Sequence, residues 1–201
     1  MAVSDNTITL SGRIVSDFEF SSEVYGEKFY TIFVSCVRKS GTEDKIPVMI
    51  SERLLKPDKY IGKIIFVQGE IRSYDKRVKE KSRLKVYVFA TYATIKLNSD
   101  EEDKNAVTLT GHICRKPTYR LVNNEKEISD FIISVKRKYN KSGYIPCVCW
   151  GRMAKYVFGL DVGTKVTITG RFQSWDYIKN IDGKDTTHTT YEVSASNIKV
   201  M

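Results

Sequence analysis

An internal repeat constrains the fold of this chain more than any other feature of its sequence. The segment around Gly12, Ile8-Thr9-Leu10-Ser11-Gly12-Arg13-Ile14, recurs 99 positions later as Thr108-Leu109-Thr110-Gly111-His112-Ile113. Ser35, Ile46 and Pro47 recur at the same shift as Ser134, Ile145 and Pro146. Gly62, Gly69, Ser73 and Asp75 recur at a shift of 101 as Gly163, Gly170, Ser174 and Asp176, and Ile95-Lys96 recurs at 103 as Ile198-Lys199. A shift that changes only by loop-sized steps indicates two copies of one folded unit of about 100 residues.

The 201 residues therefore divide into two units of ordinary domain size. A polar, acidic run without periodicity separates the end of copy one from the start of copy two. We expect a first domain over residues 1–97, an acidic linker over 98–104 and a second domain over 105–201.

Each copy has the sequence pattern of β-strands, because its segments are rich in β-branched and aromatic residues. The strands predicted in copy one are Thr7 to Ile14, Phe29 to Arg38, Lys45 to Ile50, Lys63 to Ser73 and Arg83 to Ile95. Those of copy two are 106–114, 128–138, 144–150, 164–177 and 187–200. Turns are expected at Ser40-Gly41, Ser142-Gly143 and Asn180-Ile181-Asp182-Gly183.

One segment in each copy has a helical pattern, and it falls between the third and fourth strands. Arg152 to Leu160 places Met153, Tyr156, Val157 and Leu160 on one face, with Gly163 as a stop. The matching segment, Glu52 to Tyr60, contains Pro57 and should form a shorter or irregular helix. The order predicts an all-β chain of two tandem OB-fold five-stranded barrels, each with one short helix between strands 3 and 4. OB folds hold oligonucleotides, oligosaccharides or other subunits, so the fold alone does not specify a function.

The charge favours a polyanionic partner, although lysines that only maintain solubility would explain it as well. The net charge is +9, with +4 in residues 1–100 and +5 in residues 101–201. The sequence has no apolar run long enough for a membrane span and no pattern of a secretion signal, so we expect no membrane partner and a cytoplasmic location. Cys36, Cys114, Cys147 and Cys149 lack metal-ligand spacing. Cys147 and Cys149 should be small buried side chains on one strand face.

Copy two resembles the bacterial single-stranded-DNA-binding proteins over essentially all of residues 105–201. The resemblance rests on Asn105-Ala-Val-Thr-Leu-Thr-Gly-His-Ile-Cys-Arg-Lys-Pro117, Ser129-Asp-Phe-Ile-Ile-Ser-Val135, Ile145-Pro-Cys-Val-Cys-Trp-Gly151, Val162-Gly-Thr-Lys-Val-Thr-Ile-Thr-Gly-Arg-Phe-Gln-Ser174 and Tyr191-Glu-Val193. Copy one resembles the family more faintly, through Gly12-Arg-Ile-Val-Ser-Asp-Phe-Glu19 and Gly69-Glu-Ile-Arg-Ser-Tyr74. The resemblance implies single-stranded-DNA binding in replication, recombination or repair.

Binding of unpaired bases requires exposed rings for stacking and cations along the phosphates. The resemblance assigns stacking to Tyr139, Tyr144, Trp150 and Tyr177. We add Trp175, because residues two apart on a strand share a face. Barrel-end packing is the alternative for Trp150. The accompanying cations are Lys136, Lys138 and Arg171 on strands and Arg115 in the turn after the first strand.

Copy one departs from this pattern, because the counterparts of four of these five rings are not aromatic. Tyr139, Tyr144, Trp150 and Tyr177 correspond to Ser40, Lys45, Ser51 and Lys76, and Trp175 corresponds to Tyr74. The hairpin that begins with Lys76 and Arg77 carries six cations and one acid up to Lys85. It should hold phosphates electrostatically and stack bases poorly. Tyr25, Phe29 and Tyr30 would compensate where they face outward, but Phe29 and Tyr30 cannot both point the same way on a strand.

Several expectations follow for partners and for competing functions. We expect a homodimer with four OB domains, with a monomer as the alternative, and no cofactor, metal or small-molecule substrate. Family members usually end in an acidic tail that recruits other enzymes, and here Lys199-Val200-Met201 follow the last predicted strand, so that recruitment is expected to be absent. A replication-assembly protein similar to primosomal replication protein n stays open, as does RNA binding. Catalysis is not expected, because Asp17, Glu19, Asp75 and Asp176 are scattered and His112 and His188 have no placed acid or nucleophile.

Overall fold

The fold of the chain is nearly all β, as the sequence predicted. A computed structural model describes residues 5–78, 81–96, 103–122, 125–137, 141–181 and 184–201. The first half of the chain contains β1 (Asn6–Ile14), β2 (Glu19–Val24), β3 (Glu27–Val37), β4 (Glu43–Ser51), β5 (Ile64–Val78) and β6 (Lys81–Lys96). The second half contains β7 (Lys104–Ile113), β8 (Thr118–Val122), β9 (Lys126–Lys136), β10 (Ser142–Trp150), α1 (Arg152–Phe158), β11 (Lys165–Ile181) and β12 (Lys184–Val200).

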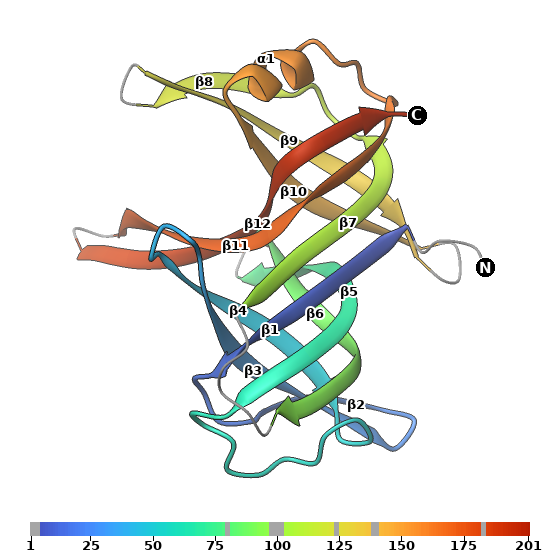
Figure 1. The fold of residues 1–201 in the computed structure, drawn as a ribbon, viewed down its shortest axis with the longest axis vertical. Coiled ribbons are helices and arrows are strands. Elements are labelled where there is room, and N and C mark those ends of the chain that lie inside the picture. Colours follow the sequence, from blue (N-terminus) through green and yellow to red (C-terminus); the bar gives the residue numbers. More distant parts are fainter. Residues whose placement is uncertain (1–4, 79–80, 97–102, 123–124, 138–140, 182–183) are drawn as a thin grey trace.

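The two halves have the same strand pairing, which closes each of them into a barrel. In the first half β1 pairs with both β5 and β3, and β4 runs parallel to β6. In the second half β7 pairs with both β11 and β9, and β10 runs parallel to β12. This is the OB-fold arrangement in tandem (Figure 1). The domain boundaries 1–97, 98–104 and 105–201 stay a prediction.

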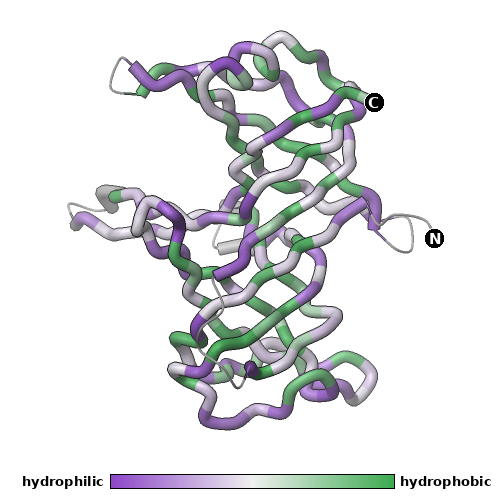
Figure 2. Tube along the Cα trace, in the orientation of Figure 1, coloured by the Kyte–Doolittle hydropathy of each residue, from purple (hydrophilic) through white to green (hydrophobic). Residues whose placement is uncertain are grey.

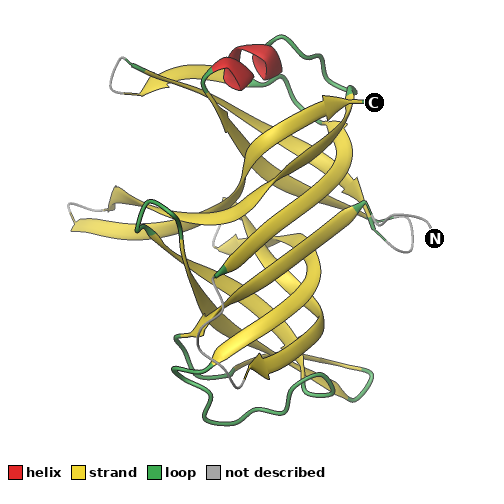
Figure 3. Ribbon diagram, viewed as in Figure 1, coloured by secondary structure: helices red, strands yellow, loops and turns green. Residues whose placement is uncertain are grey.

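The first strands of the two halves join the barrels edge to edge. β1 and β7 pair in antiparallel register from Asn6 opposite Leu109 to Ser11 opposite Lys104. Their pairing links all twelve described strands into one sheet that runs through both barrels (Figure 3). The unpaired edge of each first strand, which would otherwise be exposed, is thus covered by its counterpart.

Each barrel has its own apolar interior, which follows from the alternation of side chains along the strands. Figure 2 shows apolar positions alternating with polar ones through both barrels. Leu10, Ile32 and Val67 are fully buried in the first half, and Leu109, Ile133 and Phe172 are buried in the second. Cys147 and Cys149 lie in the second core, as predicted from their spacing. Burial raises the pKa of Cys149 to about 12, so this thiol is held protonated.

The structure confirms the five-stranded barrels and corrects the prediction of a helix in each copy. Five described strands close each barrel, β1-β3-β4-β6-β5 in the first half and β7-β9-β10-β12-β11 in the second. Each half also has a short edge strand, Glu19–Val24 or Thr118–Val122, that the sequence did not indicate. α1 confirms the predicted helix of copy two, although it buries Ala154 and Val157 and leaves Tyr156 exposed. In copy one the described segment from Glu52 to Tyr60 forms turns and no helix. Pro57 lies in this segment, and Leu54, Leu55 and Tyr60 pack there against the core.

Two local predictions are also wrong. Ser142 and Gly143 begin β10 and are not the turn before it. The predicted repeat shift of 103 at the last strand is also wrong. Gly69 and Gly170 are equivalent, and they pair with Ala90 and Ala195, so Ala90 corresponds to Ala195 and the shift on this strand is 105. Ile95 therefore corresponds to Val200. The shift changes from 101 to 105 at the tip of the long hairpin: Val78 and Lys81 pair across two residues in copy one, whereas their equivalents Lys179 and Thr186 pair across six residues in copy two.

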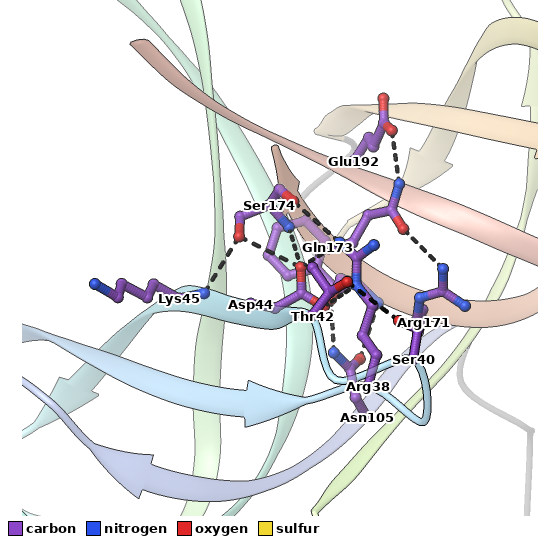
Figure 4. Close-up of polar contacts among 11 residues, drawn as sticks. Arg38, Ser40, Thr42, Asp44, Lys45, Asn105, Arg171, Gln173, Ser174 and Glu192 are labelled. Carbon is purple, nitrogen blue, oxygen red and sulfur yellow. Dashed lines mark hydrogen bonds and ion pairs between the residues drawn. The ribbon is translucent and has the colours of Figure 1, made fainter. Parts of the chain in front are cut away.

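Two long hairpins, β5–β6 and β11–β12, extend from the barrels and contact the opposite half. The Oγ of Ser174 on β11 accepts a hydrogen bond from the backbone N–H of Lys45, at 3.2 Å. The Oγ of Ser73 on β5 accepts one from the backbone N–H of Tyr144, at 3.0 Å. The two contacts are equivalent under the repeat. Figure 4 shows the first of them, where the β11–β12 hairpin lies against the turn between β3 and β4.

Candidate nucleic-acid interface

The predicted rings on β10 lie on the outer face of the second barrel, on the side of the strand opposite its core. Ile145, Cys147 and Cys149 alternate into the interior, so Tyr144 and Trp150 project on the other side. Tyr144 is 49% exposed and Trp150 is 43% exposed. The six-residue separation along the strand places them roughly 20 Å apart. This is far enough for several nucleotides to lie between them.

The long hairpin contributes further rings to the same face. Trp175 and Tyr177 share one side of β11, and their ring centroids are 5.4 Å apart. Tyr177 lies opposite His188 of β12, with ring centroids 5.6 Å apart. Trp175 is 43% exposed and Tyr177 is 38% exposed. The result is a row of three rings, of which Trp175 and Tyr177 are exposed and His188 is partly buried.

Polar side chains connect this row to the base of the hairpin. Arg171 donates to the Oε1 of Gln173 at 3.1 Å, and Gln173 donates to Glu192 at 2.8 Å, as Figure 4 shows. Burial raises the pKa of Glu192, an effect that the hydrogen bond from Gln173 partly offsets. Burial also lowers the pKa of Arg171, and its Nε has no hydrogen-bond partner among the described residues. Ionised Glu192 would repel a phosphate here, and Arg171 is a cation with donor capacity left over.

Trp150 and Arg171 line a common groove of about 530 Å³. Its other lining residues are Glu125, Lys126, Glu127 and Gly151. A cavity of this size lies within the range of ligand pockets. The groove places an exposed indole ring beside a guanidinium, the two groups that a stacked base and its phosphate need.

The remaining predicted residues are placed differently. Lys136 is exposed at the end of β9, opposite Ser142 of β10. Arg115 is exposed just after β7, next to the Lys116–Asp161 ion pair. It lies near the start of β11, whereas Trp175 lies toward the other end of that strand, so the structure does not bring Arg115 to the rings. Tyr74 is 49% exposed on β5. Lys138 and Tyr139 lie outside the described residues, and so do the side chains of Lys76 and Arg77 on β5.

Three residues of this face were missed by sequence reasoning. His188, Gln173 and Glu192 join the rings only through the register of β11 with β12. The alternation of Arg171, Gln173, Trp175 and Tyr177 could have indicated Gln173. The partners on β12 could not be found in the same way, because the hairpin of the second half is four residues longer than that of the first and changes the repeat shift to 105.

Among the described residues, no cluster of histidine, cysteine, aspartate and glutamate has the arrangement of a metal site. The described part of the chain also has no helix with the length and apolar character that crossing a membrane requires.

Comparison with known proteins agrees with this geometry. Residues 104–201 match the single-strand binding protein family. A deletion variant of the single-stranded DNA binding protein from Thermus aquaticus superposes with a TM-score of 0.76 at 18% identity, covering 100% of this chain and 96% of its own. The wild-type Thermus aquaticus protein gives a TM-score of 0.76 at 17% identity, covering 98% and 92%. No curated protein matches the sequence.

The sequence match and the structural matches cover different parts of the chain. The family match is one of sequence and is confined to the second half. The structural match extends over both halves and, at these identities, establishes the fold. Residues 104–201 thus match the single-strand binding protein family in sequence, and the whole chain has the tandem OB fold of the Thermus aquaticus proteins.

Proposed function

We propose that this protein binds single-stranded DNA without sequence preference, through the outer face of its second half. The observation that carries the proposal is the row formed by Trp175, Tyr177 and His188, which continues the face that holds Trp150 and Arg171. Every base has a π face, so such rings accept any sequence. The proposal includes Tyr144 and, from the resemblance, Tyr139.

Two forces would hold the strand. Stacking contributes about 1–3 kcal/mol for each base placed on a ring. Release of counterions from phosphates adds a term that falls steeply with salt, and the net charge of +9 favours it. Arg171, Lys136 and Lys138 are the cations proposed for the second half, and Lys76 and Arg77 are proposed for the first. Arg115 would contact only DNA that extends past the far end of β11.

The proposal describes a non-catalytic protein without a cofactor that acts in replication, recombination or repair. Two chains would supply four OB folds, so we propose a homodimer. All four cysteines are unpaired, which suits the reducing cytoplasm.

The test uses the intrinsic tryptophan fluorescence of the full chain during titration with poly-deoxythymidine at several salt concentrations. Both tryptophans, Trp150 and Trp175, belong to the second half. Stacking should quench them strongly, and the logarithm of the affinity should fall linearly with the logarithm of the salt concentration. Unchanged emission together with no DNA retained in a gel shift would refute the proposal.

A pair of variants makes the test specific to the face. Tyr177→Ala should weaken binding by about 1–3 kcal/mol. Tyr156→Ala is the matched control, because Tyr156 is equally aromatic and 51% exposed but lies on α1. Equal losses in the two variants would argue against the outer face as the binding surface.

A further inference from the structure

The outer face of the first half carries aromatic side chains at positions where the second half has none. Phe29, Phe33, Tyr87 and Phe89 lie on the noncore sides of β3 and β6. The pairings make them equivalent to Ile128, Ile132, Glu192 and Ser194 of the second half, respectively. Tyr74, equivalent to Trp175, lies 5.7 Å from Tyr87 between ring centroids. The first half therefore lacks aromatic residues at the positions equivalent to Tyr144 and Trp150, but it has other aromatic residues on the same face.

Three of these rings line one groove. Phe33, Tyr74 and Tyr87 come from β3, β5 and β6 and bound a groove of about 640 Å³. Thr31, Pro47 and Met49 also line it, and Phe20 and Ser21 lie at its β2 edge. The opposite side is formed by Thr187, His188, Thr189 and Tyr191 of the β11–β12 hairpin, so the second half completes the groove.

The charges of this groove suit phosphates better than those of the second half. Asp130 and Glu192, the carboxylates on the second outer face, are replaced by Thr31 and Tyr87. Of the remaining acids, Glu70 is paired with Arg72 at 3.0 Å, Glu19 lies at the rim, and Asp176 accepts a hydrogen bond from Thr189 of the groove wall at 2.7 Å. Lys85 lines the groove and belongs to the basic hairpin, which carries six cations between Lys76 and Lys85.

Arg72 makes a cation–π contact with one of the rings on this face. Its guanidinium lies over the ring of Phe89, 3.5 Å from the centroid, and Phe89 packs against Phe29 at 5.8 Å. A cation held over a ring in this way stays close to the surface without filling the groove. Phe29 and Phe89 lie on β3 and β6 beside the groove, so this packing supports the two strands that carry Phe33 and Tyr87.

We propose that this groove is a second binding subsite for single-stranded DNA, in which bases stack on Phe33, Tyr74 and Tyr87 while Lys85 and its hairpin hold the phosphates. The subsite rests on the proposed function for its ligand, but it uses residues that the second half does not have. Because the β11–β12 hairpin forms one side of it and presents Trp175 and Tyr177 on its other side, a strand could pass around this hairpin from one half to the other.

The experiment counts binding sites in the full chain with two independent signals. The probe is an oligothymidylate of about eight nucleotides, which is short enough for one OB fold. Calorimetric titration reports all sites. Tryptophan quenching reports the second-half site, because the first half contains no tryptophan and neither Trp150 nor Trp175 lines the groove. The wild type should bind two probes per chain. Phe33→Ala combined with Tyr87→Ala should bind one, with the quenching unchanged.

Two sets of variants separate lost stacking from lost folding. Tyr92→Ala is the matched control, because Tyr92 also lies on β6 and is 50% exposed but does not line the groove. It should still bind two probes. Ser21→Glu combined with Thr187→Glu adds charge at exposed positions on both sides of the groove and leaves the rings in place. This variant should bind one probe and unfold at the wild-type denaturant concentration.

The outcomes distinguish this subsite from the proposed function. One probe per wild-type chain with full tryptophan quenching would overturn the subsite and leave the second-half site intact. Alternatively, the wild type could bind one probe without tryptophan quenching, and the Phe33→Ala, Tyr87→Ala variant could bind none. That result would support the subsite and overturn the second-half site. Two probes bound by both groove variants would overturn the subsite.

Discussion

Among single residues, Glu192 links the ionisation of the protein to its predicted affinity for DNA. Burial raises its pKa, and its carboxylate lies on the face that holds Trp175. Because the folded-state pKa is raised, its contribution to stability is present at low pH and is lost as the pH rises through that pKa. Ionised Glu192 should also repel phosphates.

Glu192→Gln should therefore be more stable than the wild type at neutral pH and equally stable in acid. It should bind single-stranded DNA a few-fold more tightly at neutral pH, with a flatter pH dependence between neutrality and acid. Urea unfolding and fluorescence titration across this pH range would measure both effects. Glu23→Gln, an exposed glutamate on β2, should change neither. A variant that loses stability at neutral pH would contradict the assignment.

At the scale of an element, each long hairpin depends on a glycine at the point where its strand leaves the barrel. A Cβ at Gly170 would collide with the backbone carbonyl of Ser194, and one at Gly69 would collide with that of Phe89. Gly170→Ala should therefore cost about 1–3 kcal/mol in the free energy of unfolding. Denaturant unfolding would measure the loss.

Gly143→Ala provides the comparison for this element. A Cβ at Gly143 meets its nearest neighbour, the Cδ of Arg137, at 3.5 Å, an ordinary contact. This variant should be neutral or more stable by up to about 1 kcal/mol, because alanine restricts the unfolded chain. Similar losses for Gly170→Ala and Gly143→Ala would show that close backbone approach is not the cause.

The glycines also show which features of the strands could be predicted from the sequence. Gly12 and Gly111 also lie where a Cβ would collide with a neighbouring strand, so the repeat preserves the sites of close approach. Hydrophobic alternation located the long strands, and the spacing of Trp175 and Tyr177 predicted their shared face. The edge strand Glu19–Val24 alternates weakly, since all its residues except Ser22 are exposed. It is held by its pairing with β3, which no local pattern records.

The outer face of the first half was predicted less well, for a reason that involves both halves. Comparison at fixed shifts identified the loss of rings at Ser51 and Lys45. It could not identify Tyr87 as a replacement, because the shift changes to 105 across the tip of the hairpin, which is four residues longer in the second half. The contribution of Thr187 and Tyr191 to the same groove depends on packing between halves that are distant in sequence.

For the whole molecule, the junction around Asp44 should determine how firmly the two halves hold each other. The buried carboxylate of Asp44 pairs with Arg38 at 2.6 Å and accepts a hydrogen bond from the backbone N–H of Ser174 at 2.8 Å. Arg38 also donates to the carbonyl oxygen of Ser174 at 3.1 Å. The equivalent junction in the other half has Gly143 in place of Asp44, so it lacks this carboxylate.

Asp44→Ala should leave the Arg38 guanidinium partly buried without its carboxylate and should cost about 3–5 kcal/mol in the free energy of unfolding. Ser73→Ala, at the equivalent junction, removes one hydrogen bond to Tyr144 and should cost about 1 kcal/mol. Asp161→Ala, which breaks an exposed ion pair with Lys116, should cost at most about 1 kcal/mol. Urea unfolding would rank the three, and hydrogen exchange at the Ser174 amide should quicken in Asp44→Ala alone. If Asp44→Ala unfolds like Asp161→Ala, the halves are held together by the β1–β7 pairing and the junction contributes little.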